Sequence, residues 1–477
     1  MKKRILLAMG AVVVGVPLLI TAWFYIGGIE TGDTSLPDDA DLLWTPPEVA
    51  DEDNALVAIL AATNLVNTAN FGTNESGIRN MPLGRWDMSF VGRYGDGDLI
   101  RFGSRSVREE PGAAEKADRI LADNAAFYAA FAKGLERRGF RNAGPVDEVL
   151  GRQVLPIAGF MDLAWLWRLK IQREAERGEW SAAMNSLEVL CRFGRLVLNN
   201  AASFSDFVAG GIIERFALDK IVDLAAVEGA GEDALLRLAA LADGDEAASA
   251  SNCVRTVRGM YTDLVAELPK TSAVGLLRSL DCDSPFWRIC PVLEHWPFYR
   301  GFALDERWTR RRLADVAHAF LLGETDLAAD ERFSLINPFV RNWNGRHQVN
   351  WFARTCRDLE KGSQMNKKMA FHRTRAQLVV AAARWRLSHD GKLPPALDAL
   401  VPQYLPAVPV DPWSKDGRPL CYDAESGVAW SVGRWGNFNF VVMKNAKPIV
   451  QRSAKYSIRE FAFPLDGKPL DLLDNVK

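Results

Sequence analysis

The sequence predicts a mainly α-helical protein with an N-terminal transmembrane helix, a helical-hairpin bundle or stack, and a small C-terminal α+β module. Three observations lead to this prediction. An uncharged apolar run occupies positions 5–29, apolar residues recur at spacings of three and four through the centre, and short alternating segments follow the last long helix. The expected parts are an anchor over 1–29, a linker over 30–53, a helical domain over 54–360, and a helix plus a small antiparallel sheet over 361–477.

The first part of the chain has the features of a membrane anchor. Lys2, Lys3 and Arg4 precede a run from Ile5 to Ile29 that carries no charged side chain. About 20 apolar residues suffice to cross the hydrocarbon core, and a basic start keeps the N-terminus in the cytoplasm. We therefore expect a single-pass protein of a bacterial inner membrane, anchored in the lipid bilayer with a periplasmic body. The alternatives are a cleaved signal peptide, although no convincing cleavage site is present, and a buried core helix.

The rest of the composition is that of an ordinary globular protein. The chain has 477 residues, of which 48% are apolar, and a formal net charge of −2. It lacks the basic clustering typical of nucleic-acid binders, so we expect no nucleic-acid partner. The acidic, proline-containing segment 30–53 favours a spacer, and a helix should begin near Asn54. The stretch 71–112 has no helical period and is expected to be irregular.

The central part of the chain predicts a series of helices. The clearest unit runs from Pro156 to Asn199, where two helices meet at Gly178 and form an antiparallel hairpin. This unit resembles a tetratricopeptide repeat in Trp167, Gly178 and Ala183. No second copy occurs at the repeat period of about 34 residues, so a plain helical bundle or stack is favoured over a repeat array. Further helices are expected over 205–226, 232–242, 246–268 and 304–322.

A long helix from Gln364 to His389 opens the C-terminal region. Its apolar side chains share one face: Met365, Met369, Ala376, Val379, Val380, Ala383 and Leu387. Its cationic side chains lie mostly elsewhere and are expected to be solvated, with binding to lipid headgroups or a partner as the alternative: Lys367, Lys368, Arg375, Arg384 and Arg386. Alternating runs at 419–422, 428–432 and 438–442 then predict a small antiparallel sheet.

The six cysteines fall on the side of the membrane where disulfides form. Cys282 and Cys290 flank a proline-containing loop and form the favoured pair. Cys191 lies on an apolar helical stripe, which indicates a small core residue. One cluster contains side chains that zinc can use: Asp281, Cys282, Asp283, Cys290, Glu294 and His295. The disulfide already accounts for both of its cysteines, so we expect neither a metal nor a cofactor.

The sequence contains no recognisable catalytic motif. A phosphate-binding loop, a nucleophile elbow, a zinc-binding helix and a dinucleotide fingerprint are all missing. Isolated carboxylates such as Asp305 and Glu306 have no assignable role, and Asp411 fits a turn better than a reaction. The aromatic, proline-rich stretch 281–308 predicts a loop tucked onto the core, with a binding rim as the alternative. Catalytic residues are therefore unknown, and an enzyme is not the leading interpretation.

About fifty residues from Arg384 resemble the C-terminal half of the major pseudopilins of type II secretion. The similar positions are Gly391, Pro394, Leu405, Pro406, Pro409, Asp411, Pro412, Trp413, Tyr422, Ser431 and Gly433. Two features depart from that family. The N-terminus lacks the short leader followed by an aromatic residue and a glutamate, and the stretch Arg434–Asn437, equivalent to the calcium-binding loop, has no carboxylate. The resemblance therefore implies a pseudopilin-like module without a calcium site.

The order of these parts is similar to that of uncharacterised, membrane-anchored helical proteins of bacterial envelopes. That resemblance implies an architecture and a location but no mechanism. Our leading hypothesis is an anchored, extracytoplasmic interaction or scaffold protein with a protein partner in the envelope. The two alternatives are an envelope hydrolase with an unidentified active site and an accessory protein of a secretion system.

Overall fold

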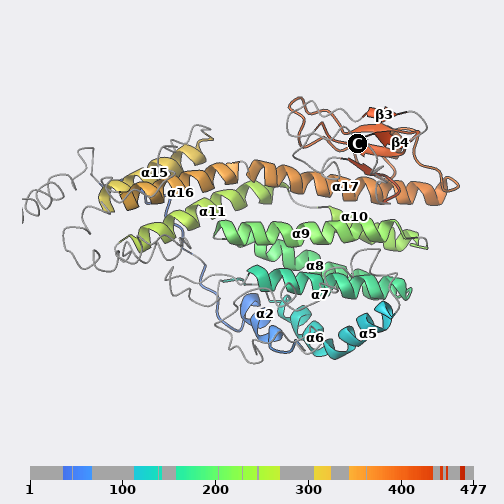
Figure 1. Ribbon diagram of the computed structural model, residues 1–477, viewed down its shortest axis with the longest axis horizontal. Coiled ribbons are helices and arrows are strands. Elements are labelled where there is room, and N and C mark those ends of the chain that lie inside the picture. Colours follow the sequence, from blue (N-terminus) through green and yellow to red (C-terminus); the bar gives the residue numbers. More distant parts are fainter. Residues whose placement is uncertain are drawn as a thin grey trace, which may run out of the picture.

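The computed structural model describes residues 36–45, 47–66, 112–137, 139–141, 157–201, 203–227, 229–243, 246–268, 306–323, 343–360, 362–432, 441–443, 447–449 and 462–467. These ranges contain eleven α-helices and five short strands, so the predicted mainly helical class is confirmed, together with a small antiparallel sheet (Figure 1). None of the helices in these ranges is both long and apolar enough to span a bilayer. The predicted anchor over 1–29, the Cys282–Cys290 pair and the candidate zinc ligands lie outside them.

The centre of the molecule is a two-layer stack of helices. One layer consists of α7 (Ile157–Glu176), α9 (Phe204–Ala225) and α17 (Gly362–Ser388), with α9 packed between the other two. The second layer consists of α8 (Trp180–Asn199), which packs on α7 and α9, and α10 (Glu232–Ala242), which packs on α9 and α17. Figure 1 shows these helices following one another across the molecule. Of the two predicted arrangements, a bundle or a stack, the protein therefore adopts the stack.

Local signals define where these helices begin and end. Gly178 has φ +74° and closes α7 before α8 starts, as the predicted hairpin requires. The Ser203 hydroxyl accepts a hydrogen bond from the Asp206 amide, and the Asp206 carboxylate accepts one from the Ser203 amide, which makes a capping box for α9. Helix α2 (Ala55–Thr63) begins at the predicted Asn54, whose side chain accepts a hydrogen bond from the Leu56 amide.

Two glycines allow α8 and α9 to approach each other closely. A Cβ atom at Gly194 would lie 2.7 Å from the Glu214 backbone nitrogen, and one at Gly210 would lie 2.5 Å from that of Leu198. Any larger residue at either position would push the two helices apart. This close packing fixes the position of Glu214 inside the stack, where it forms the ion pair described below.

Three helices cover the end of the stack next to α7. Helix α2 packs on α6 (Ala125–Gly134), and α5 (Ala113–Asp123) packs on α6 and α7. Aromatic rings fill the interface: Phe131 lies 5.6 Å from Trp167 and 5.1 Å from Phe193, measured between ring centroids. Cys191 is buried in the same core, which confirms its predicted role, and burial raises the pKa of its thiol to about 12.

A second hydrophobic core lies around α11 (Glu246–Glu267), α15 (Glu306–Leu321) and α16 (Trp343–Glu360). Part of the predicted spacer belongs to it, because Leu42 is fully buried there. Arg310 holds the Asp39 carboxylate in two hydrogen bonds of 2.8 and 3.0 Å, and the Tyr261 hydroxyl donates a third. Residues 36–45 are thus packed on the helical body.

The C-terminal module rests on α17. Strands β1 (Cys421–Asp423), β2 (Val428–Trp430) and β5 (Ala462–Pro464) form an antiparallel sheet in the order β1–β2–β5, and β3 (Val441–Met443) pairs with β4 (Lys447–Ile449). Phe463 of β5 packs against Phe371 of α17, with ring centroids 5.7 Å apart. The sequence pattern predicted the β1–β2 pair, whereas β5 joins from a segment that carried no strand prediction.

The packing of α17 corrects two details of its predicted faces. Leu387, expected on the apolar face, is 57% exposed because the helix extends beyond the core at that end. The cationic side chains expected to be solvated include Arg375, which pairs with Asp219, and Arg384, which pairs with Glu232. These arginines bind neighbouring helices, since α9 and α10 bring carboxylates against them.

Candidate functional site

The layer of α7, α9 and α17 leaves one polar face uncovered by the second layer. On α9, the partly exposed residues Arg215, Asp219 and Asp223 follow one another at helical spacing along a single stripe. Helix α7 borders this stripe on one side and α17 borders it on the other. We call the surface formed by these side chains the open face: Trp165 and Arg168 of α7, Arg215, Asp219 and Asp223 of α9, and His372 and Arg375 of α17.

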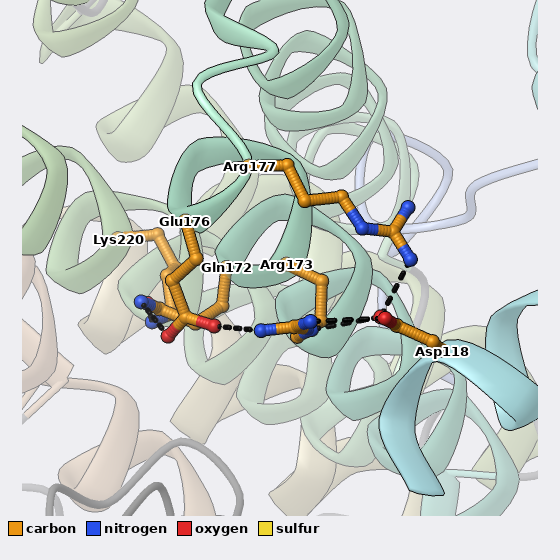
Figure 2. Close-up of polar contacts among 6 residues, drawn as sticks. All are labelled: Asp118, Gln172, Arg173, Glu176, Arg177 and Lys220. Atoms are coloured by element: carbon orange, nitrogen blue, oxygen red, sulfur yellow. Dashed lines mark hydrogen bonds and ion pairs between the residues drawn. The ribbon is translucent and has the colours of Figure 1, made fainter. Parts of the chain in front are cut away.

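A continuous series of polar contacts runs along one end of the open face, from α5 across α7 to α9 (Figure 2). Arg173 donates to both oxygens of Asp118 at 2.9 and 3.0 Å, and it donates to Glu176 at 2.5 Å. Glu176 also accepts a hydrogen bond of 2.8 Å from the Gln172 amide, whose oxygen accepts one of 2.8 Å from Lys220. We call this series the polar ladder. It ties three helices together.

The charges of the polar ladder stabilise one another. The hydrogen bonds from Arg173 hold the pKa of Asp118 at about 2, burial opposes this shift, and Arg177 adds a contact of 2.6 Å. The same bonds raise the pKa of Arg173. Lys220 has a fully buried side chain, but its ammonium reaches the half-exposed Asp223 carboxylate at 2.9 Å. Each charge in the ladder therefore has an opposite charge in contact.

A buried ion pair joins α9 to α17 beneath the open face. The Arg373 guanidinium donates to the Glu214 carboxylate at 2.7 Å, and both side chains are almost completely buried. The other carboxylate oxygen of Glu214 and the Nε of Arg373 are buried without a hydrogen-bond partner. The pair thus fixes the register of the two helices while leaving part of its hydrogen-bonding capacity unused.

Asp219 lies at the centre of the open face among three basic side chains. Its carboxylate lies 3.2 Å from Arg375, 3.6 Å from His372 and 3.9 Å from Arg215. Burial acts to raise the pKa of Asp219, but His372, Arg375 and Arg168 outweigh it and lower the pKa to about 2. Asp219 therefore stays ionised near neutral pH and cannot serve as a general acid there.

Arg168 differs from every arginine described above. Its guanidinium lies 4.4 Å from the Trp165 ring centroid and 4.9 Å from that of Phe216, and these two rings pack 4.7 Å apart. Within the described ranges it forms neither a hydrogen bond nor an ion pair, and its Nε is buried without a partner. Desolvation lowers the pKa of Arg168, although Asp223 and Asp219 attract its charge from a greater distance.

The charges of the open face do not balance. Three arginines of the open face, namely Arg168, Arg215 and Arg375, accompany two carboxylates, Asp219 and Asp223, while Lys220 belongs to the polar ladder. The polar ladder and the buried Glu214–Arg373 pair are each neutral, so they leave this excess in place. A half-buried positive excess with an unpartnered guanidinium is suited to binding an anionic group.

Of the candidate site residues singled out from the sequence, Arg375 lies at this face, whereas Asp411 and Glu306 lie elsewhere. Asp411 is a buried turn residue, as predicted: its carboxylate accepts hydrogen bonds from the Trp413 amide, the Ser431 hydroxyl and the Val432 amide. Glu306 lies exposed at the start of α15, and Asp305 falls outside the described residues. Across the ranges that the structure covers, no three metal-binding side chains converge on one point.

The sequence interpretation missed Arg168, Asp219 and His372. The available signal was the series Arg215, Asp219, Asp223, in which charged residues recur every four positions along one face of the helix. That pattern predicts a polar stripe, but its neighbours on α7 and α17 come from distant parts of the chain. Comparisons with protein-family models, with curated proteins and with solved structures found no match for this chain.

Proposed function

We propose that this protein is a membrane-anchored, extracytoplasmic scaffold whose helical stack binds another protein of the cell envelope through the open face. The observation that carries the proposal is an arginine, Arg168, that has no hydrogen-bond or ion-pair partner in the part of the chain that the structure describes and that lies among half-buried charges on α7, α9 and α17. A buried charge without a partner is unfavourable for folding. A partner protein that contacts the Arg168 guanidinium would explain why this charge is placed there.

The anchored location rests on the sequence of positions 1–29 and on the apolar length of that run. The packing of residues 36–45 on α11 and α15 supports the proposal, because it connects the helical body to the chain just after the anchor. The envelope is therefore where the partner is expected.

The hydrolase alternative finds less support at this face. A carboxylate that acts as a general acid needs a pKa raised toward the working pH. The two carboxylates of the open face are instead bound by cations, Asp219 by Arg375 and Asp223 by Lys220, and the pKa of Asp219 is about 2. The secretion-accessory alternative rests on the pseudopilin-like segment and would be supported by co-purification with secretion components.

A cross-linking pull-down of the full-length protein from its native membrane tests this function. The decisive comparison is between Arg215→Glu on the open face and Arg192→Glu on α8, because the two side chains are 48% and 47% exposed and each faces a carboxylate one turn away. We expect a defined envelope partner that Arg215→Glu loses and Arg192→Glu keeps. Recovery of no partner by the unmodified protein, or equal recovery by both variants, would contradict the proposal.

A further inference from the structure

The chemistry around Arg168 indicates what kind of group the open face binds. The flat faces of a guanidinium suit aromatic rings, whereas its N–H groups lie in the plane and point outward as a fork. Trp165 and Phe216 occupy the ring-binding side of Arg168. The two rings, tilted by 49° to each other, pack against the guanidinium and restrict the side chain before any ligand arrives.

The surroundings of Arg168 select for a single negative group. Arg215 and Arg375 add positive charge nearby on α9 and α17, while Asp219 and Asp223 are too far from Arg168 to form an ion pair with it. An incoming anion could therefore accept hydrogen bonds from the Arg168 guanidinium. Its attraction to the guanidinium would be stronger than that of the more distant Asp219 and Asp223 carboxylates.

We propose that Arg168 is the specificity-determining contact of the open face, and that it binds a side-chain or terminal carboxylate from an acidic segment of the partner protein. This inference rests on the proposed scaffold function and names the chemistry of the partner. A carboxylate presents two oxygens in one plane, which matches the guanidinium fork in two parallel hydrogen bonds.

An acidic protein segment fits better than a nucleic acid or a membrane surface. Nucleic-acid binding draws on several phosphate contacts, whereas the open face has an excess of only one positive charge. A bilayer is flat and needs protruding cations, but Arg168 is half-buried, and the turn at Gly467 bounds the face by lying against Ala226 and Val222. A narrow peptide segment can reach the guanidinium where a flat surface cannot.

The test measures fluorescence anisotropy of a fluorescein-labelled hexaglutamate peptide titrated with the full-length protein in detergent at low ionic strength. A hexaglutamine peptide with the same label controls for binding that does not depend on charge. We expect hexaglutamate to bind, Arg168→Gln to weaken that binding at least tenfold, and Arg168→Lys to give an intermediate loss, because lysine keeps the charge but loses the fork. Arg192→Gln on α8 is the matched control and should bind like the unmodified protein.

Three outcomes would overturn the inference: no binding of hexaglutamate, equal binding by Arg168→Gln, or an Arg168-dependent interaction with phosphatidylglycerol vesicles in place of the peptide. The pull-down separates this inference from the proposed function. A partner lost by Arg215→Glu but kept by Arg168→Gln leaves the scaffold function standing and removes the role of Arg168. Peptide binding that depends on Arg168, with no envelope partner recovered, would support the carboxylate site alone.

Discussion

Two arginines on the same helix have opposite environments. Arg173 in the polar ladder contacts Asp118 and Glu176, and its pKa is raised by the hydrogen bonds to Asp118. Arg168, five positions earlier on α7, has two aromatic rings beneath it and no carboxylate in contact, and desolvation lowers its pKa. One environment stabilises a positive charge and the other disfavours it.

This difference separates charges that hold the stack together from a charge that is available for binding. Removing a member of a saturated network leaves another charge unpaired inside the protein, so stability should fall. Removing a charge that has no partner leaves nothing unpaired, so stability should be maintained while binding is lost. The following predictions test this contrast, beginning with the largest expected effect.

The buried Glu214–Arg373 pair should give the largest loss. Replacing either residue with alanine leaves an uncompensated charge between α9 and α17, and we expect the free energy of unfolding to fall by about 3–5 kcal/mol. Urea denaturation of the full chain, followed by circular dichroism, measures the effect. The double variant Glu214→Leu with Arg373→Met should recover most of the loss, because no charge is then left unpaired. A double variant as unstable as the single ones would show that the pair stabilises the stack directly.

Asp411→Ala should destabilise the C-terminal module by about 2–3 kcal/mol, since two backbone amides and a hydroxyl lose their acceptor in a buried site. Hydrogen exchange of the Trp413 and Val432 amides should become faster. The exposed Asp416 in the same loop provides a control, and its replacement by alanine should leave both amides protected. Unchanged protection in Asp411→Ala would mean that the turn forms without its side chain.

Asp118→Asn should weaken the polar ladder in a pH-dependent way. The pKa of Asp118 is lowered from 3.8 to about 2, so its contribution to stability is present above about pH 4 and disappears as the pH falls toward 2. Because this side chain is partly exposed, we expect a difference of only about 0.5 kcal/mol between protein and variant at neutral pH. Thermal unfolding measured between pH 2 and pH 7 should show the two curves converging at the acidic end. A constant difference across that range would exclude the ionised carboxylate as its cause.

Arg168→Met should have the smallest effect on stability, with no loss and at most a gain of a few tenths of a kcal/mol, because it removes a partly desolvated charge that has no partner among the described residues. Arg173→Met is the matched control on the same helix and should lower the melting temperature. A lower melting temperature for Arg168→Met than for Arg173→Met would show that the contacts of Arg168 with the Trp165 and Phe216 rings stabilise the stack. That result would contradict the proposed difference between the two arginines.

Most of the helical architecture was predictable, because helix signals are local. The predicted range 232–242 coincides with α10, and Gly178 marked the turn between α7 and α8. The features missed by the prediction depend on residues far apart in the chain. Strand β5 is defined by its pairing with β2, and Arg373 meets Glu214 across 159 positions. Arg168 is distinctive because no carboxylate among the described residues contacts it, and a single sequence does not contain that information.

If the protein is anchored as proposed, the packing of residues 36–45 limits how far the helical body can stand from the bilayer. If the whole segment 30–53 were a free tether, it could extend for about 85 Å. With Asp39 and Leu42 held against α11 and α15, only the chain between Ile29 and Asp39 would remain to span that distance, and it covers about 35 Å at most. In a protein anchored at Ile29, α11 and α15 would therefore lie within that reach of the lipid, and the anchor would keep this end of the helical body close to the membrane.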